Sequence, residues 1–153
     1  MSVEGSAEQD GKVLLSVVGA HLSGQPLNHE LTSRGARLVR TVRTAEDYEL
    51  YALAGTSPPK PGLRRRLGFK GPGIEVEVWA LSVSAFGRFV EAVPAPLAIG
   101  SVKLADGGVV KGFVCEPHGF EGAVDITHFG SWRAYRAAQL DQEASGPGLD
   151  PEC

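Results

Sequence analysis

Residues 14–29 read LLSVVGAHLSGQPLNH, and this stretch decides the fold. Residues 14–18 are apolar apart from one serine, which predicts a strand that is buried on both faces. The polarity changes at Gly19, where a loop rich in small residues begins. Because small side chains leave the main chain accessible, a ligand can approach the backbone N–H groups of this loop. We therefore expect a small anion to bind there.

His21 is the sharpest candidate for chemistry in this loop. Imidazole titrates near neutral pH, so a histidine can donate or remove a proton. A loop histidine can equally be hydrogen-bonded for structure only, and the sequence leaves that alternative open. His29, His118 and His128 show no ligand spacing among themselves, so we expect no metal site and no cofactor.

The composition indicates one domain with a hydrophobic core, in a chain of 153 residues. A net charge of −3 without a basic block argues against nucleic acid as a partner. No apolar run approaches the roughly 18 residues of a membrane span, and the polar start is unlike a signal peptide. We therefore expect a cytoplasmic protein that does not bind membranes. Cys153 lies in a polar tail, so we expect no disulfide with Cys115.

The ends of the chain are polar and lack apolar periodicity. We expect disordered tails at residues 1–11 and 139–153, which flank a single domain of residues 12–138. Alternating and β-branched segments predict strands after the first one, at residues 36–44, 48–53, 63–67, 74–81, 99–104 and 109–115. The last two form a hairpin with Asp-Gly at its turn.

Two segments show helical periodicity, residues 82–93 and residues 129–140. Ser82 or Ser84 can cap the first of them. Together with the strands, they predict an α+β domain with a curved or barrel-like mixed sheet and about two helices.

Basic residues offer further anion contacts. Arg34, Arg37, Arg40 and Arg43 recur every three residues, and we expect most of them to lie on a solvated strand face. One, such as Arg43, can pair with a carboxylate. Lys60 stands between prolines, which restrict the backbone on either side, so it is a better-positioned anion contact than a free surface lysine. The sequence leaves a simple surface role for Lys60 open as the alternative.

Glu91 and Ser23 are two further polar residues that we considered for a catalytic role. Glu91 lies near the apolar stripe of the first predicted helix, where burial would raise its pKa and suit it to acid–base work. The alternative is a glutamate that flanks the core and faces water. Ser23 has no nucleophile-elbow spacing and no paired base, so a serine hydrolase triad is not supported.

Eight segments in order resemble the C-terminal domain of allophanate hydrolase. They are residues 17–28, 35–38, 44–53, 59–63, 74–79, 94–100, 110–113 and 129–135. A weaker resemblance joins the chain to the γ-glutamyl cyclotransferase-like superfamily, which opens with a strand and a Tyr-Gly-Ser/Thr-Leu loop. Residues 18–21 read VGAH at that position, so the tyrosine and the hydroxyl residue are absent. Residues 77–79 match its later strand, and Glu91 is then the nearest acidic residue on the following helix.

The resemblance implies a γ-glutamyl cyclotransferase-like fold and a reaction. It implies breakdown of N-carboxycarbamate, or a similar small dicarboxylate, to carbon dioxide and ammonia, as in urea degradation. Losing carbon dioxide leaves electron density on nitrogen, so a general acid is needed, and His21 fits that role. Glu91 is the second catalytic candidate.

The expected binding set surrounds His21. Backbone N–H groups of Gly19, Ala20 and Leu22 are expected to bind one carboxylate, and Lys60 or Arg43 the other. Ser23 and Asn28 complete the predicted substrate-binding set. A second hypothesis is a non-catalytic module that binds a small carboxylate or docks onto a separately encoded amidase-signature protein. The resemblance also allows a homodimer.

Overall fold

The computed structural model describes residues 11–149. The expected N-terminal tail, apart from Gly11, lies outside the described residues, as do residues 150–153. In chain order the helices and strands are β1 (Lys12–Val17), α2 (His29–Thr32), β2 (Arg37–Arg43), β3 (Tyr48–Ala52), β4 (Pro61–Arg65), β5 (Glu75–Ser82), α3 (Val83–Glu91), β6 (Leu97–Lys103), β7 (Val109–Cys115), β8 (Val124–Asp125) and α4 (Trp132–Leu149).

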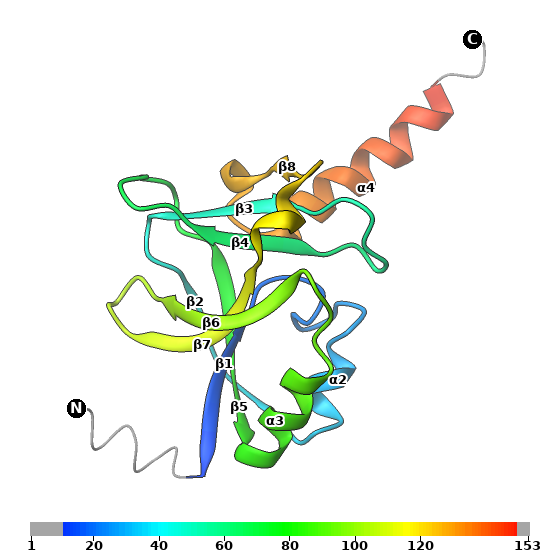
Figure 1. Cartoon of the computed structure of the whole chain (residues 1–153). Helices are drawn as coiled ribbons and strands as arrows, with labels where there is room; N and C mark the ends of the chain where they lie inside the picture. The colour runs from blue at the N-terminus through cyan, green and yellow to red at the C-terminus, as the bar shows by residue number, and fades with distance from the viewer. Residues whose placement is uncertain (1–10, 150–153) are drawn as a thin grey trace.

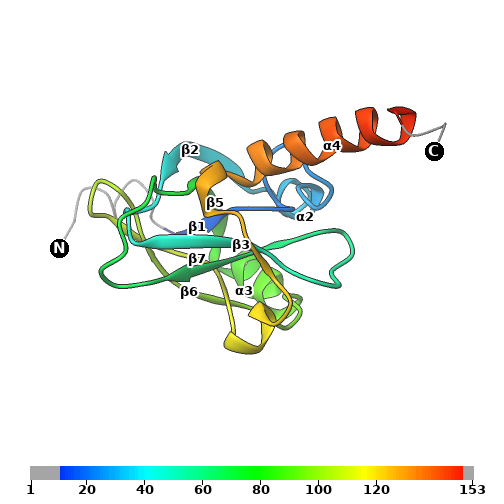
Figure 2. The ribbon, with the colours of Figure 1, turned by 90° about the horizontal axis from the view of Figure 1, so that it is seen from above.

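The strands form two sheets. The larger has the order β2-β5-β1-β7-β6, and the smaller has the order β4-β3-β8. Strand β1 runs antiparallel to β5 and parallel to β7, so the larger sheet is mixed. Figures 1 and 2 show the smaller sheet lying across one end of the larger one, with α2 and α3 at the other end. This arrangement confirms the predicted α+β class with curved mixed sheets.

Strand β1 is the centre of the domain. Leu15 and Val17 on one face of β1 and Ser16 on the other are all buried, because β1 has a neighbouring strand on each side and side chains packed on both faces. The prediction of a strand buried on both faces is confirmed. The chain leaves the sheet directly after Val17, so the small-residue loop begins at the buried end of the central strand of the larger sheet.

The hairpin and the first predicted helix form as their local signals indicate. At the β6–β7 turn, the carboxylate of Asp106 accepts the N–H of Gly108 at 2.9 Å, and Gly107 adopts a φ of 92°, which favours glycine. The hydroxyl of Ser82 accepts the N–H of Ala85 at 3.1 Å and caps α3. Phe89 then packs into the core.

Helix α4 differs from its prediction at both ends. Residues 127–129 form a separate short 3₁₀ turn that ends at Gly130, which has a φ of 73°, so α4 starts at Trp132. At its other end α4 continues to Leu149, so residues 139–149 are helical rather than disordered. Residues 139–144 lack an apolar stripe but include residues with high helix propensity, such as alanine, glutamine and glutamate, whereas residues 145–148 read SGPG, whose helical conformation propensity does not explain. Figure 1 shows this half projecting away from the sheets.

No helix within residues 11–149 is long and apolar enough to cross a lipid bilayer.

Candidate functional site

His21 is packed inside the domain and is 8% exposed. Its ring stacks on Phe113, with ring centroids 5.1 Å apart, and meets the edge of Phe89 at the same distance. Phe113 belongs to β7 and Phe89 to α3, and their two rings also contact each other, with centroids 5.7 Å apart, so the three rings form one cluster. The structure therefore places His21 at a fixed position where the two elements meet.

The imidazole has one ionic partner. Its Nε2 atom lies 2.7 Å from a carboxylate oxygen of Glu30 in α2. Because a carboxylate only accepts, Nε2 carries the proton, and Nδ1 holds the free lone pair of the neutral ring. Burial lowers the pKa of His21 below its ordinary value of 6.5, against the opposing effect of Glu30. His21 is therefore mostly neutral at pH 7.

The lowered pKa of His21 predicts a pH-dependent stability. In the unfolded chain His21 titrates at its ordinary pKa of 6.5, so between that value and the lower folded pKa the unfolded state binds more protons. The free energy of unfolding is therefore expected to fall as the pH drops through 6.5, and this contribution levels off below the folded pKa. Urea unfolding of the wild type and of His21→Phe, from about pH 8 to about pH 5, measures it. An equal pH dependence in both proteins would contradict this prediction.

The backbone of the loop offers three unused donors. Within residues 11–149, the N–H groups of residues 19–21 donate to no other group. The N–H of Leu22 instead donates to the carbonyl of Gly19 at 3.0 Å, so the expected ligand contact from Leu22 is replaced by a turn. Asn28 holds the loop through its side-chain amide, which donates to the carbonyl of His21 at 2.8 Å. Asn28 therefore supports the loop.

A small cavity of about 20 Å³ adjoins this backbone. It brings together four residues of the predicted site, Gly19, Ala20, His21 and Lys60. The remaining lining residues are apolar, namely Val18, Pro61, Leu97 and Phe113. This volume is room for about one water molecule.

Position 19 requires glycine because Pro61 packs directly against its backbone. A Cβ atom at this position would lie 2.2 Å from Cδ of Pro61, which is too short for any contact. The loop and the start of β4 can therefore meet only with glycine here.

Ser23 is tied to a buried carboxylate at the end of the loop. Glu77 of β5 accepts the N–H of Ser23 at 2.8 Å and its hydroxyl at 3.0 Å. The indole N–H of Trp79 donates to the same oxygen at 3.1 Å, and Arg133 of α4 approaches the other oxygen at 3.2 Å. Ser23 is thus occupied by structural hydrogen bonds, although the sequence places it in the substrate-binding set.

Two predicted site residues lie away from the small cavity. Glu91 is exposed in the last turn of α3 and is not part of the cavity wall. The guanidinium of Arg43 donates to the carbonyl of Gly73 at 2.9 Å and borders a different cavity. The geometry therefore separates both residues from His21.

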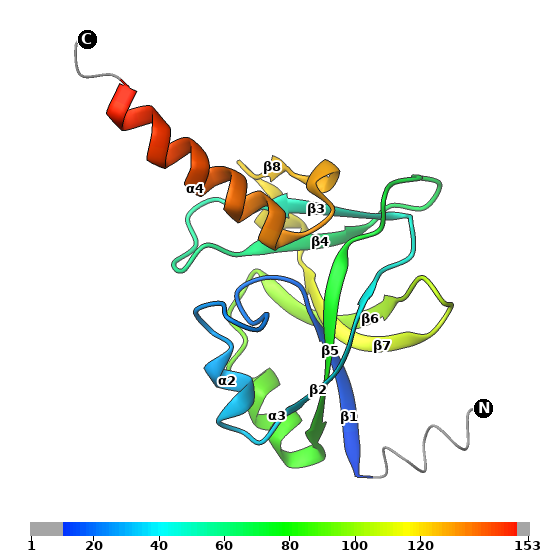
Figure 3. The ribbon, with the colours of Figure 1, turned by 180° about the vertical axis from the view of Figure 1, so that it is seen from behind.

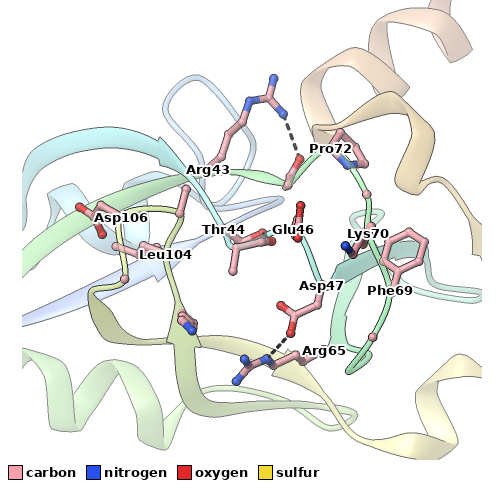
Figure 4. A pocket seen from close by; sticks show the side chains of 17 residues that line it. Arg43, Thr44, Glu46, Asp47, Arg65, Phe69, Lys70, Pro72, Leu104 and Asp106 are labelled. Carbon is pink, nitrogen blue, oxygen red and sulfur yellow. Dashed lines mark hydrogen bonds and ion pairs between the residues drawn. The ribbon is translucent and has the colours of Figure 1, made fainter.

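The second cavity is larger, about 720 Å³, and is shown in Figure 4. Its wall contains charged side chains from several segments, including Arg43, Glu46, Asp47, Arg65 and Lys70. Arg65 and Asp47 pair with each other at 2.9 Å, as the dashed line in Figure 4 marks. No residue of this wall also lines the His21 cavity, so the two are separate spaces.

The sequence interpretation missed four residues of the site: Glu30, Glu77, Phe113 and Arg133. Glu77 carried a signal, because it alternates with apolar residues in β5 on the same face as Trp79. The others carry no local signal, since their contacts with the loop depend on tertiary folding. Within the described residues, no cluster of three or more His, Cys, Asp or Glu side chains has the geometry of a metal site.

Comparison with known proteins identifies the family. Residues 13–137 match the family model of the allophanate hydrolase C-terminal domain. The chain belongs to this family. The chain is also similar to urea amidolyase of Saccharomyces cerevisiae. The two are 45% identical over 126 residues, which cover 80% of the chain and 7% of that enzyme. The chain thus spans a small fraction of the length of this curated relative.

Solved structures agree with membership of the allophanate hydrolase C-terminal domain family. Kluyveromyces lactis allophanate hydrolase superposes with a TM-score of 0.79 at 44% identity, covering 82% of this chain and 21% of that one. A protein specific to uropathogenic E. coli superposes with a TM-score of 0.75 at 36% identity, covering 82% of this chain and 96% of that one. A γ-glutamyl cyclotransferase matches 68% of this chain and 66% of its own, with a TM-score of 0.50 at 16% identity, which confirms the predicted fold alone.

Proposed function

We propose that the chain binds N-carboxycarbamate at the His21 cavity and accelerates its breakdown to carbon dioxide and ammonia. One observation carries this proposal: residues 19–21, whose N–H groups make no hydrogen bond within residues 11–149, line one cavity together with Lys60. Backbone N–H groups and an ammonium are the donors that a small dicarboxylate needs. Membership in the allophanate hydrolase C-terminal domain family supports this choice of substrate.

The proposed reaction consists of two proton-dependent decarboxylations. In the first, the bond between nitrogen and one carboxyl carbon breaks, its electron pair stays on nitrogen, and a proton joins that nitrogen. The products are carbon dioxide and carbamate, which loses a second carbon dioxide on further protonation to leave ammonia. His21 is neutral in the free protein, but a dianion beside it raises its pKa and favours the protonated ring. His21 then delivers the first proton.

Binding requires the small cavity to widen. A dicarboxylate occupies far more than the space of about 20 Å³ beside His21. Lys60 is a half-buried part of the wall with a long side chain, and it is the last residue of the proline-containing loop between β3 and β4. We propose that its side chain moves outward as the ligand enters and then contacts the second carboxylate.

The size of the cavity favours a second candidate, a non-catalytic module. On this proposal the packing of His21 against Phe89 and Phe113 is structural, and the domain serves assembly. Its partner is then a separate amidase-signature protein or a second copy of this chain. This candidate agrees with the small share of urea amidolyase that the chain covers.

Malonate, a stable dicarboxylate of similar shape, tests ligand binding at the cavity. Titration followed by amide NMR is expected to shift the resonances of residues 19–21. Lys60→Ala is expected to weaken binding about tenfold, because it removes a charge-assisted contact. Lys70→Ala is the matched control, since it removes the same charge from the wall of the larger cavity.

If Lys60→Ala binds malonate as tightly as the wild type, or if only Lys70→Ala binds it more weakly, the carboxylate site does not lie beside His21. Absence of any binding would favour the assembly module. Gel filtration of the wild type, alone and with an amidase-signature protein, then tests that second candidate directly.

A further inference from the structure

Glu77 anchors the far end of the loop that carries His21. It is 4% exposed, and one of its carboxylate oxygens accepts three hydrogen bonds, two of them from Ser23. Hydrogen bonds to an ionised carboxylate are about twice as strong as neutral ones. Ser23 is therefore held to the middle of β5, a strand that directly neighbours β1.

Arg133 joins this anchor to α4. Its Nη2 atom donates to the carbonyl of Ser23 and to the second carboxylate oxygen of Glu77, the latter at 3.2 Å. A single nitrogen thus contacts both the loop and the strand. Figure 3 shows the first turn of α4 near the start of β5. In agreement, the N–H of Glu75 donates to the carbonyl of Gly130 at 2.9 Å.

A tight turn connects Ser23 to the residues of the candidate ligand site. The N–H of Leu22 donates to the carbonyl of Gly19, so residues 19–22 form one closed unit directly before Ser23. The unbonded N–H groups of residues 19–21 lie inside this unit. Their directions depend on where Ser23 is held, and Arg133 contacts its carbonyl.

We propose that Arg133 is a positioning residue, through which α4 sets the conformation of the loop that presents the N–H groups of residues 19–21 to a carboxylate. Arg133 does not line the cavity, so it acts through Ser23 and Glu77 rather than on the ligand. The effect on ligand affinity rests on the proposed function, whereas the effect on loop conformation does not.

The test compares Arg133→Ala with Arg136→Ala. Both remove one arginine from the same helix, but Arg136 donates a hydrogen bond to Gln139 and lies over the ring of Trp132, away from Ser23 and Glu77. Two quantities are measured in each variant, the hydrogen-exchange rates of the Leu22 and Ser23 amides and the dissociation constant for malonate. Arg133→Lys is included because an ammonium, although one bond shorter, can donate to both acceptors.

In Arg133→Ala, exchange of the Leu22 and Ser23 amides is expected to rise at least about tenfold more than that of the Leu15 amide in β1. Malonate is expected to bind about tenfold more weakly, with the melting temperature within about 5 °C of Arg136→Ala. Arg133→Lys is expected to lie between Arg133→Ala and the wild type in both quantities.

Equal acceleration of exchange in the loop and in β1 would show general destabilisation and overturn the proposal, as would unchanged loop exchange. Should Arg133→Ala fail to fold, the comparison of Arg133→Lys with Arg136→Ala decides by the same criterion. If the wild type does not bind malonate, the proposed function fails, and the exchange rates still decide the role of Arg133.

Discussion

Replacing His21 is expected to reduce catalysis about 10²–10⁴-fold, the typical contribution of a positioned acid–base group. The measurement is carbon dioxide or ammonia release from freshly generated N-carboxycarbamate, corrected for spontaneous decay. The structure changes the choice of variant, because His21 is packed against two phenylalanines and His21→Ala would leave a cavity there. His21→Phe keeps an aromatic ring in place and removes the imidazole nitrogens, together with the bond from Nε2 to Glu30.

His29→Ala is the matched control for this experiment. His29 is the other histidine next to the loop, but it is exposed, and its ring bonds to the carbonyl of Pro26. It is expected to keep wild-type activity. If the wild type does not exceed the uncatalysed rate, the enzyme proposal fails and the assembly module becomes the preferred function. If His21→Phe is as active as the wild type, the proton comes from elsewhere, and Glu91→Gln tests the second candidate that the sequence suggests.

Trp132→Ala is expected to lower the free energy of unfolding by about 3–5 kcal/mol, the usual cost of truncating a buried aromatic side chain. Trp132 is 2% exposed and attaches the first turn of α4 to the core. Its ring also lies 5.4 Å from that of Tyr135, so the truncation loses an aromatic contact as well as buried area. Urea unfolding followed by circular dichroism measures the loss.

Leu140→Ala provides the control in the same helix. Leu140 is 56% exposed and lies in the half of α4 that projects from the sheets, so its truncation is expected to cost less than about 0.5 kcal/mol. A comparable loss in the two variants would mean that the projecting half also packs in solution. A negligible loss in Trp132→Ala would mean that the domain folds independently of α4.

The sequence by itself determined the elements whose signals are local. The apolar run before Gly19 was sufficient to predict β1, and Asp-Gly was sufficient for the β6–β7 turn. Ser82 marked the start of α3, since a hydroxyl at that position satisfies a free N–H of the first helical turn. In each case the deciding groups lie within a few residues of each other, so no knowledge of the rest of the chain is needed.

The sequence also brought together part of the candidate site. Gly19, Ala20 and His21 are consecutive, so their shared position at one cavity follows from the end of β1. Lys60 was predicted from its flanking prolines, and the pairing of β3 with β4 carries it to the same place. Arg43 was chosen for its charge alone, and charge does not determine which cavity a strand end faces.

Only the tertiary structure decided which charged side chains contact the loop and fix its position. Glu30 reaches the imidazole because the chain turns back through α2, and Arg133 reaches Ser23 across 110 positions of sequence. Glu77 occupies a position in β5 that periodicity assigns to a polar face, yet the loop and α4 cover it and supply its donors. Burial and hydrogen-bond partners depend on which distant segments cover a residue, so they appear only when the whole chain is packed.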